Sequence, residues 1–156
     1  MTTKKMAIIA TKGALDMAYP PLILASTAAA LDWEVQVFFT FYGLSLLRKD
    51  ISDIRISPLA NPAMPMPMPM PVTLRMMPGM EAMATSMMKA KMKKKGVATL
   101  EELRSLCLEA DVKFIACQMT VDLFDFQKSD FIDGIEFGGA ATFLQFAGET
   151  DVSLFI

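Results

Sequence analysis

Short apolar segments that alternate with helix-forming segments constrain the fold of this chain more than any other feature. The clearest of them is Val112–Cys117 (VKFIAC), which is apolar at all but one position. Strands that are apolar on both faces are typical of parallel sheets, which helices cover on both sides. The sequence therefore predicts an α/β fold built on a mostly parallel sheet.

The predicted strands and helices follow one another along the whole chain. The predicted strands are residues 5–11, 33–39, 54–57, 112–117, 134–137 and 152–156, of which 54–57 fits the pattern least well. The predicted helices are residues 18–31, 43–48, 79–95, 100–110, 118–124 and 140–146. Asp16 is the predicted cap of the first helix, because Pro20 and Pro21 are tolerated only in a first turn. Thr99 and Glu102 have the spacing of a capping box.

A proline- and methionine-rich segment, residues 58–78, interrupts this alternation. Proline and methionine alternate strictly from Met64 to Pro71. Because every second residue there is a proline without a backbone N–H, this segment cannot form the regular hydrogen bonds of a helix or a β-sheet. We expect an extended, polyproline-like loop within one domain of residues 1–156. Methionine thioethers are suitable ligands for Cu(I), so a copper site is one interpretation of this segment. A polyproline II helix has roughly three residues per turn, however, so only Met64 and Met70 would lie on the same face. The favoured interpretation is a stiff arm over the sheet edge or a neighbouring subunit.

Charge and apolar content limit the partners of the chain. Lys and Arg number 15 against 17 Asp and Glu, a net charge of −2 that offers no general attraction for nucleic acid. A lysine run at residues 89–95 is a solvated helix end, or a docking surface for an acidic partner.

The most apolar stretches, 17–31 and 35–47, are shorter than the roughly 20 residues of a membrane span. With no signal peptide either, we expect a cytoplasmic protein; peripheral membrane association stays compatible with the sequence.

The chain contains no histidine and only two cysteines. The lack of histidine removes Ser-His-Asp and Cys-His nucleophile pairs and the commonest general base near neutral pH. Two cysteines are too few for a disulfide scaffold or a four-ligand zinc site. We therefore expect no cofactor and no metal, and any chemistry to run through a thiol.

The loops at the carboxyl ends of parallel strands are where such sheets bind ligands. This rule selects Thr11, Lys12, Gly13, Phe41, Tyr42, Gly43, Cys117, Gln118, Met119, Gly138 and Gly139. Cys117 is the nucleophile among them, and its place at a helix start would lower its pKa. Gln118 and nearby N–H groups are candidate donors, and Lys12 would help if the strands at 5–11 and 112–117 were neighbours. A small buried hydrophobe is an equally good interpretation of Cys117.

The other cysteine, Cys107, lies on the apolar face of a predicted amphipathic helix. Leu100, Leu103 and Cys107 recur at helical spacing, which places this thiol in the core. A role as a second, resolving thiol is the alternative.

Several segments of the chain together form a recognisable pattern: AIIATKGALDMAYPPLILA (7–25), FFTFYGLSLL (38–47), NPAMPMPMPMP (61–71), PGMEAMAT (78–85), IACQMT (115–120) and FIDGIEFGGAATFL (131–144). With these segments the chain resembles the DsrE/DsrF-like family, and within it the DsrE-type branch associated with rhodanese and TusA sulfur carriers. The resemblance implies a three-layer flavodoxin-like or Rossmann-like fold of about five strands, and frequent homo-oligomers. It also implies a cysteine that carries sulfane sulfur as a persulfide or a thiosulfonate, and only Cys117 matches its place.

The leading hypothesis is therefore a cytoplasmic sulfur carrier in which Cys117 exchanges sulfur with rhodanese-like or TusA-like proteins. A non-catalytic module for small-ligand binding or oligomeric assembly is the second hypothesis, and a methionine-rich Cu(I)-binding protein the third. Because no general acid or base is identifiable, the sequence leaves open whether such a carrier is an enzyme.

Overall fold

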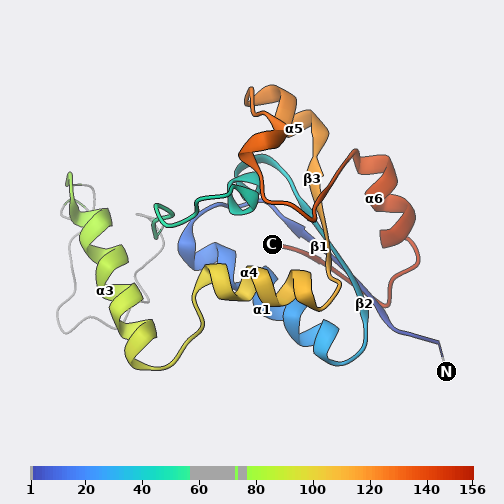
Figure 1. The fold of residues 1–156 in the computed structure, drawn as a ribbon, viewed down its shortest axis with the longest axis horizontal. Coiled ribbons are helices and arrows are strands. Elements are labelled where there is room, and N and C mark those ends of the chain that lie inside the picture. Colours follow the sequence, from blue (N-terminus) through green and yellow to red (C-terminus); the bar gives the residue numbers. More distant parts are fainter. Residues whose placement is uncertain (1, 57–72, 74–76) are drawn as a thin grey trace.

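The computed structural model describes residues 2–56, 73 and 77–156, which form one five-stranded sheet (Figure 1). Its strands are β1 (Lys5–Ala10), β2 (Glu34–Phe39), β3 (Lys113–Cys117), β4 (Glu136–Gly138) and β5 (Val152–Phe155). All four pairings are parallel, in the order β4-β3-β2-β1-β5. The predicted α/β fold with a parallel sheet of about five strands is confirmed.

Helices cover the two faces of the sheet unequally. The contacting helices α1 (Leu15–Ala30) and α4 (Leu100–Glu109) lie on one face, and the short α6 (Ala140–Ala147) lies on the other (Figure 1). Because successive strand residues point to opposite faces, β3 divides its side chains between two cores. Phe114 and Ala116 belong to the larger core with α1 and α4. Ile115 and Cys117 belong to the smaller core with Phe143 of α6.

The chain adds its strands in sequence order and then returns. β1 to β4 lie side by side in order, so β2 separates β1 from β3. The connection through α6 then crosses back to place β5 beside β1. Two further elements flank the carboxyl edge of the sheet, the 3-10 helix η1 (Phe41–Leu47) after β2 and the helix α5 (Gln118–Leu123) after β3. A second 3-10 helix, η2 (Lys128–Asp130), precedes β4.

The first helix begins earlier than the sequence predicts. Its N-cap is Ala14 and not Asp16, and Pro20 and Pro21 lie in its second turn. The reason is tertiary: the N–H of Leu15 donates to the carbonyl of Arg55 at 2.8 Å, so a distant loop supplies the cap. The predicted strand at 54–57 is also wrong for its described part, since residues 54–56 form no strand.

Local signals set the later helices correctly. The hydroxyl of Thr99 accepts from the N–H of Glu102 at 3.1 Å, and the Glu102 carboxylate accepts from the N–H of Thr99 at 2.8 Å. The predicted capping box of α4 is thus confirmed. Helix α3 (Met80–Lys94) ends before Gly96, which has a φ of 72°.

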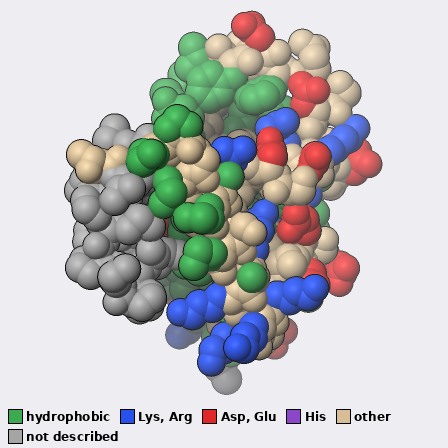
Figure 2. Space-filling model, turned by 90° about the vertical axis from the view of Figure 1, so that its left-hand side faces the viewer, with side chains coloured by type: hydrophobic (Ala, Val, Ile, Leu, Met, Phe, Trp, Pro, Cys, Tyr) green, Lys and Arg blue, Asp and Glu red, His purple; other side chains and the backbone are tan. Residues whose placement is uncertain are grey.

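Helix α3 stands beside the rest of the molecule in Figure 1. Its carboxyl end carries the exposed lysines 89, 91, 93 and 94. Figure 2 views the molecule from the left-hand side of Figure 1 and shows Lys and Arg side chains gathered on the lower part of that face, with hydrophobic side chains above them. The predicted polyproline-like loop at 58–78, with its methionines, lies almost wholly outside the described residues. Within the described ranges, none of the helices is long and apolar enough to cross a membrane.

Candidate functional site

Cys117 is the last residue of β3 and the N-cap residue of α5. Its side chain lies on the α6 face of the sheet, in the smaller core with Ala7, Phe38 and Phe143. The residue is only 4% exposed. The structure therefore places this thiol at the carboxyl edge of the sheet, as the sequence predicts, but beneath a cover of other side chains.

Two threonine hydroxyls lie beside this sulfur. Phe39 pairs with Ala116 across β2 and β3, so Thr40 follows β2 at the level of Cys117. Thr120 lies on the first turn of α5 and is completely buried. The two threonine Oγ1 atoms are 3.2 Å apart, and the N–H of Phe41 donates to Thr120 Oγ1 at 3.1 Å. The end of β2 and the start of α5 thus meet in a small hydroxyl cluster next to the thiol.

This polar surrounding outweighs the effect of burial on the thiol. Burial raises the pKa of Cys117, but hydrogen bonding from the side chain and N–H of Thr120, the Thr40 hydroxyl and the N–H of Met119 lowers it. The net result is a pKa below the ordinary value of 9.0. The N–H groups at the start of α5 and the two hydroxyls therefore act on the thiol together. A lowered pKa favours the thiolate, which is the nucleophilic form.

Cys107 has the opposite environment. It is completely buried in α4, and its S–H donates to the carbonyl of Leu22 at 3.5 Å. Burial raises its pKa to about 12. Because Cys107 belongs to the larger core and Cys117 to the smaller one, the sheet lies between the two thiols. The prediction of a core residue is confirmed, and this geometry gives no support to a resolving thiol.

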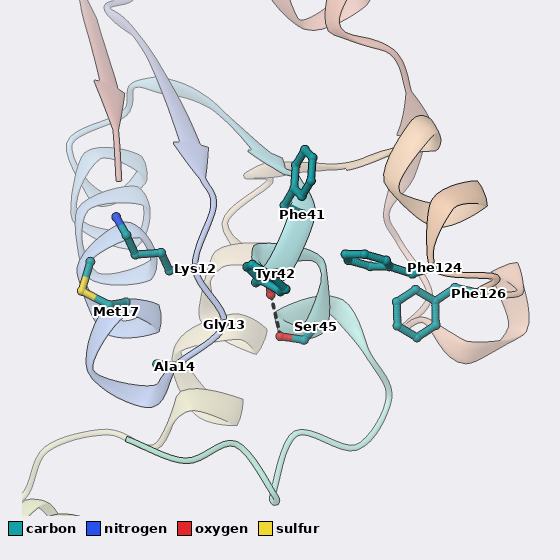
Figure 3. Close-up of a pocket in the computed structure, with 9 residues that line it drawn as sticks. All are labelled: Lys12, Gly13, Ala14, Met17, Phe41, Tyr42, Ser45, Phe124 and Phe126. Atoms are coloured by element: carbon teal, nitrogen blue, oxygen red, sulfur yellow. Dashed lines mark hydrogen bonds between the residues drawn. The ribbon is translucent and has the colours of Figure 1, made fainter. Parts of the chain in front are cut away.

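Lys12 does not lie beside Cys117. The condition for its help, neighbouring strands at 5–11 and 112–117, is not met because β2 lies between β1 and β3. Figure 3 shows the Lys12 ammonium pointing away from the rings of Phe41 and Tyr42.

Gly13 and Gly43 have a packing role at this edge. A Cβ on Gly43 would collide with the carbonyl of Ala10, and one on Gly13 with the hydroxyl of Ser45. The absence of a Cβ at both positions lets η1 pack directly against the loop after β1. Both glycines therefore position the backbone at this edge of the sheet.

The two residues after Cys117 contribute differently from the prediction. The side-chain amide of Gln118 donates to the carboxylate of Asp122 at 2.8 Å, so it is turned along α5. Met119 acts through its backbone N–H, while its side chain is exposed. Of the predicted donors, it is thus the backbone of α5 that reaches the sulfur.

An aromatic cleft of about 560 Å³ lies beside the hydroxyl cluster. Its lining residues are Lys12, Gly13, Ala14, Met17, Phe41, Tyr42, Ser45, Phe124 and Phe126 (Figure 3). The exposed ring of Tyr42 stacks on Phe124, with centroids 6.1 Å apart, and Phe41 meets the same ring edge-on. Phe41 joins the two features, because its N–H binds Thr120 and its ring lines the cleft.

Thr40 and Thr120 are the site residues that the sequence prediction missed. Thr40 directly follows a predicted strand, and Thr120 stands three residues after Cys117 on a predicted helix. The strand-end rule that selected Cys117 could have selected Thr40 as well. Their contact could not be predicted, because it depends on β2 and β3 being neighbours. Across the parts of the chain that the structure describes, no group of three or more Cys, Asp or Glu side chains could hold a metal ion.

Comparisons with known proteins place this geometry in a family. The chain matches the DsrE/DsrF/DrsH-like family over residues 2–155. It is 65% identical over 160 residues to the "Sulfur carrier protein DsrE2" of Allochromatium vinosum, with 100% of both chains covered. It is 35% identical over 158 residues to the uncharacterized protein YrkE of Bacillus subtilis, covering 99% of this chain and 98% of that one.

A solved structure shares the fold. The crystal structure of the ychN protein from E. coli superposes with a TM-score of 0.57 over 99% of this chain and 100% of that one. At 13% identity this likeness bears on the fold alone. The family match and the two relatives, which span nearly the whole chain, show that this protein belongs to the DsrE/DsrF/DrsH-like family.

Proposed function

We propose that this protein is a sulfur carrier that holds sulfane sulfur on Cys117. The observation that carries the proposal is the hydroxyl cluster of Thr40 and Thr120, beside which the pKa of a nearly buried thiol is lowered instead of raised. A structural cysteine has no need of such surroundings. The name of the DsrE2 relative, a sulfur carrier protein, supports the same function.

The proposed exchange needs no cofactor. The Cys117 thiolate attacks the outer sulfur of a donor persulfide, a new S–S bond forms on Cys117, and the donor leaves as a thiolate. An acceptor thiolate then attacks that outer sulfur, and Cys117 leaves as a thiolate in turn. Sulfane sulfur moves with no net oxidation or reduction. A thiosulfonate form would arise if Cys117 attacked tetrathionate at an inner sulfur and released thiosulfate.

The partners follow from this chemistry. A carrier gives and takes sulfur by direct contact, so we propose rhodanese-like and TusA-like proteins of the cytoplasm as its donors and acceptors. The exposed aromatic side chains of Phe41, Tyr42 and Phe124 next to the hydroxyl cluster are suited to protein contact. We also propose that the chain works as one domain and as a homo-oligomer.

Intact-mass analysis after exposure to polysulfide, thiosulfate and tetrathionate tests the proposal. The native protein should gain sulfur with polysulfide, or a thiosulfate group with tetrathionate, and Cys117→Ser should gain neither. Cys107→Ser is the matched control, because its thiol is buried in the opposite core, and it should load like the native protein. Failure to load under conditions in which iodoacetamide alkylates Cys117 would contradict the proposal.

The burial of Cys117 favours a second candidate function, a binding module for a small ligand in the aromatic cleft. In that case Cys117 is a packing residue, and Cys117→Ser would leave ligand binding unchanged. Titration of the native protein and Cys117→Ser with aromatic probes, followed by tyrosine fluorescence of Tyr42, would detect such binding. The lowered pKa of Cys117 argues against this candidate, since an unreactive thiol needs no stabilised anion.

A further inference from the structure

Phe41 has an unusual backbone for a bulky side chain. Its φ is 49°, in the left-handed region that residues other than glycine rarely adopt. Among the described residues the other non-glycine positions with positive φ are Asp32, Asp111 and Asp125, and aspartate tolerates this region. Backbone conformations of this kind are concentrated at functional sites, where the surrounding structure holds them.

The N–H of Phe41 has a definite partner at the point where this left-handed residue turns the chain into η1. Thr40 follows the last residue of β2, and its N–H still donates to the carbonyl of Ala10 at 3.1 Å. One residue later the chain turns into η1, and the N–H of Phe41 donates to Thr120 Oγ1 at 3.1 Å instead. A main-chain donor is thus aimed at a buried side chain of α5.

The hydrogen atoms of the cluster can be counted. A threonine hydroxyl has one hydrogen to donate and two lone pairs. Thr120 Oγ1 accepts from Phe41, so its own hydrogen is not used in that bond. In the contact between Thr40 and Thr120 one hydroxyl donates, and the other retains its hydrogen. If Thr40 donates, the hydrogen of Thr120 remains for the sulfur of Cys117; if Thr120 donates, the hydrogen of Thr40 remains, and the Thr120 hydroxyl then orients Thr40.

We propose that the Thr120 hydroxyl, held by the N–H of Phe41 in its left-handed conformation, stabilises the negative charge that forms on the Cys117 sulfur during exchange. Thr120 is then a further residue of the sulfur site, and Phe41 is a positioning residue that acts through it. This inference rests on the proposed function and adds a direction to it. A stabilised thiolate is a better leaving group, so the cluster favours release of sulfur from Cys117.

The pH profile of Cys117 alkylation by iodoacetamide tests the role of Thr120. In Thr120→Val the midpoint of the profile should move to higher pH, with a rate at pH 7 about two- to tenfold lower, the range for one lost hydrogen bond. Thr120→Ser keeps the hydroxyl and should follow the native profile. The plateau rate at high pH reports access to the sulfur and separates a packing change from loss of the hydroxyl. An unchanged midpoint in Thr120→Val, or an equal shift in Thr120→Ser, would overturn the inference.

Two variants of Phe41 test the backbone. Glycine adopts the left-handed region freely and keeps the N–H, so Phe41→Gly should retain the native midpoint. A β-branched residue is strongly disfavoured there, so Phe41→Val should shift the midpoint as Thr120→Val does. In a Thr120→Val background Phe41→Val should add little, because both act through one hydroxyl. Equal midpoints for Phe41→Gly and Phe41→Val would exclude the positioning role.

These alkylation experiments do not depend on sulfur transfer. Failure of the native protein to load sulfur would overturn the proposed function and leave the effect of Thr120 on the thiol measurable. If the native protein loads, transfer of its persulfide sulfur to glutathione should be slower from Thr120→Val, again about two- to tenfold, and near native from Thr120→Ser. Thermal melts identify any Phe41 variant that does not fold. In that case the comparison of Thr120→Val with Thr120→Ser tests the inference.

Discussion

At the scale of single residues, the two thiols differ because of the groups that face them. Cys107 meets apolar side chains, the carbonyl of Leu22, which accepts its S–H, and the N–H of Ser26, whose hydrogen bond does not offset the effect of burial on its pKa. Cys117 meets hydroxyl and N–H donors, which stabilise a thiolate. Burial raises the pKa of both thiols, but the combined effect of the donors exceeds it at Cys117 and does not at Cys107.

We expect the two thiols to react with an alkylating reagent over different ranges of pH. Because the pKa of Cys117 is below 9.0, its reaction with iodoacetamide should rise at lower pH than that of an ordinary thiol. Cys107, with a pKa of about 12, should stay unmodified until the protein unfolds. Peptide mass mapping after timed alkylation distinguishes the sites, and modification of Cys107 before Cys117 would contradict the assigned environments.

The same pKa directions affect stability with opposite signs. The folded state favours the Cys117 thiolate, so this contribution is present above pH 9 and is lost as the pH falls through the lowered pKa. The folded state disfavours the Cys107 thiolate, so stability is lost as the pH rises from 9 towards 12. Cys107→Ala should therefore lose less stability than the native protein between pH 8 and pH 10.5, measured by urea unfolding.

At the scale of elements, α6 is the thin cover over Cys117. It is an eight-residue helix with one fully packed side chain, Phe143, which stacks on Phe38 of β2 with centroids 5.0 Å apart. The opposite face has the longer helices α1 and α4. Since Cys117 is 4% exposed, exchange at its sulfur requires local opening, and we expect α6, which buries the single side chain of Phe143, to be the element that opens.

Removal of the Phe143 ring should expose the sulfur. We expect Phe143→Ala to lower the free energy of unfolding by about 3–5 kcal/mol, as for other buried aromatic truncations, and to raise the plateau rate of Cys117 alkylation. Leu144→Ala changes the next residue of α6, which is exposed, and should change neither quantity. An unchanged plateau rate in a folded Phe143→Ala would show that another element controls access.

At the scale of the whole molecule, the face that α6 covers is left partly open. Beside α6, a groove of about 370 Å³ runs over β1 and the edge strand β5, with Ala7, Ile9 and Phe143 in its lining. Phe155 of β5 is 73% exposed and Leu144 of α6 is 62% exposed. Within the described residues β5 pairs only with β1, so its outer edge also offers backbone hydrogen-bonding groups. An apolar face next to an edge strand is typical of a subunit contact.

We therefore expect self-association to depend on this face. If the protein is a homo-oligomer through β5, Phe155→Lys should shift its mass in solution towards the monomer, because a charge would be placed in the contact. Leu31→Lys is the control, since Leu31 is also exposed, at 63%, but follows α1 on the other side of the sheet. Light scattering after size exclusion measures both. An oligomer that survives Phe155→Lys would place the contact elsewhere.

Much of the architecture could be predicted from local sequence patterns. Strand and helix positions follow from apolar runs and from capping residues such as Thr99 and Glu102, because these signals act within a few residues. The errors arose where distant residues intervene. The start of α1 depends on the carbonyl of Arg55, and the apolar residues Ile54 and Ile56 are buried without joining the sheet. Neither contact leaves a local pattern.

The sequence by itself determined that Cys117 ends a buried strand of a parallel sheet and begins a helix, since the apolar run before it and the helix-forming residues after it are local patterns of consecutive residues. Only the tertiary structure decided what faces that sulfur. The order of strands brings Thr40 beside Thr120 and separates Lys12 from the site, and the pleat of the sheet turns Cys107 and Cys117 to opposite faces. The physical reason is that strand order and facing are set by long-range packing, which residue spacing alone does not encode.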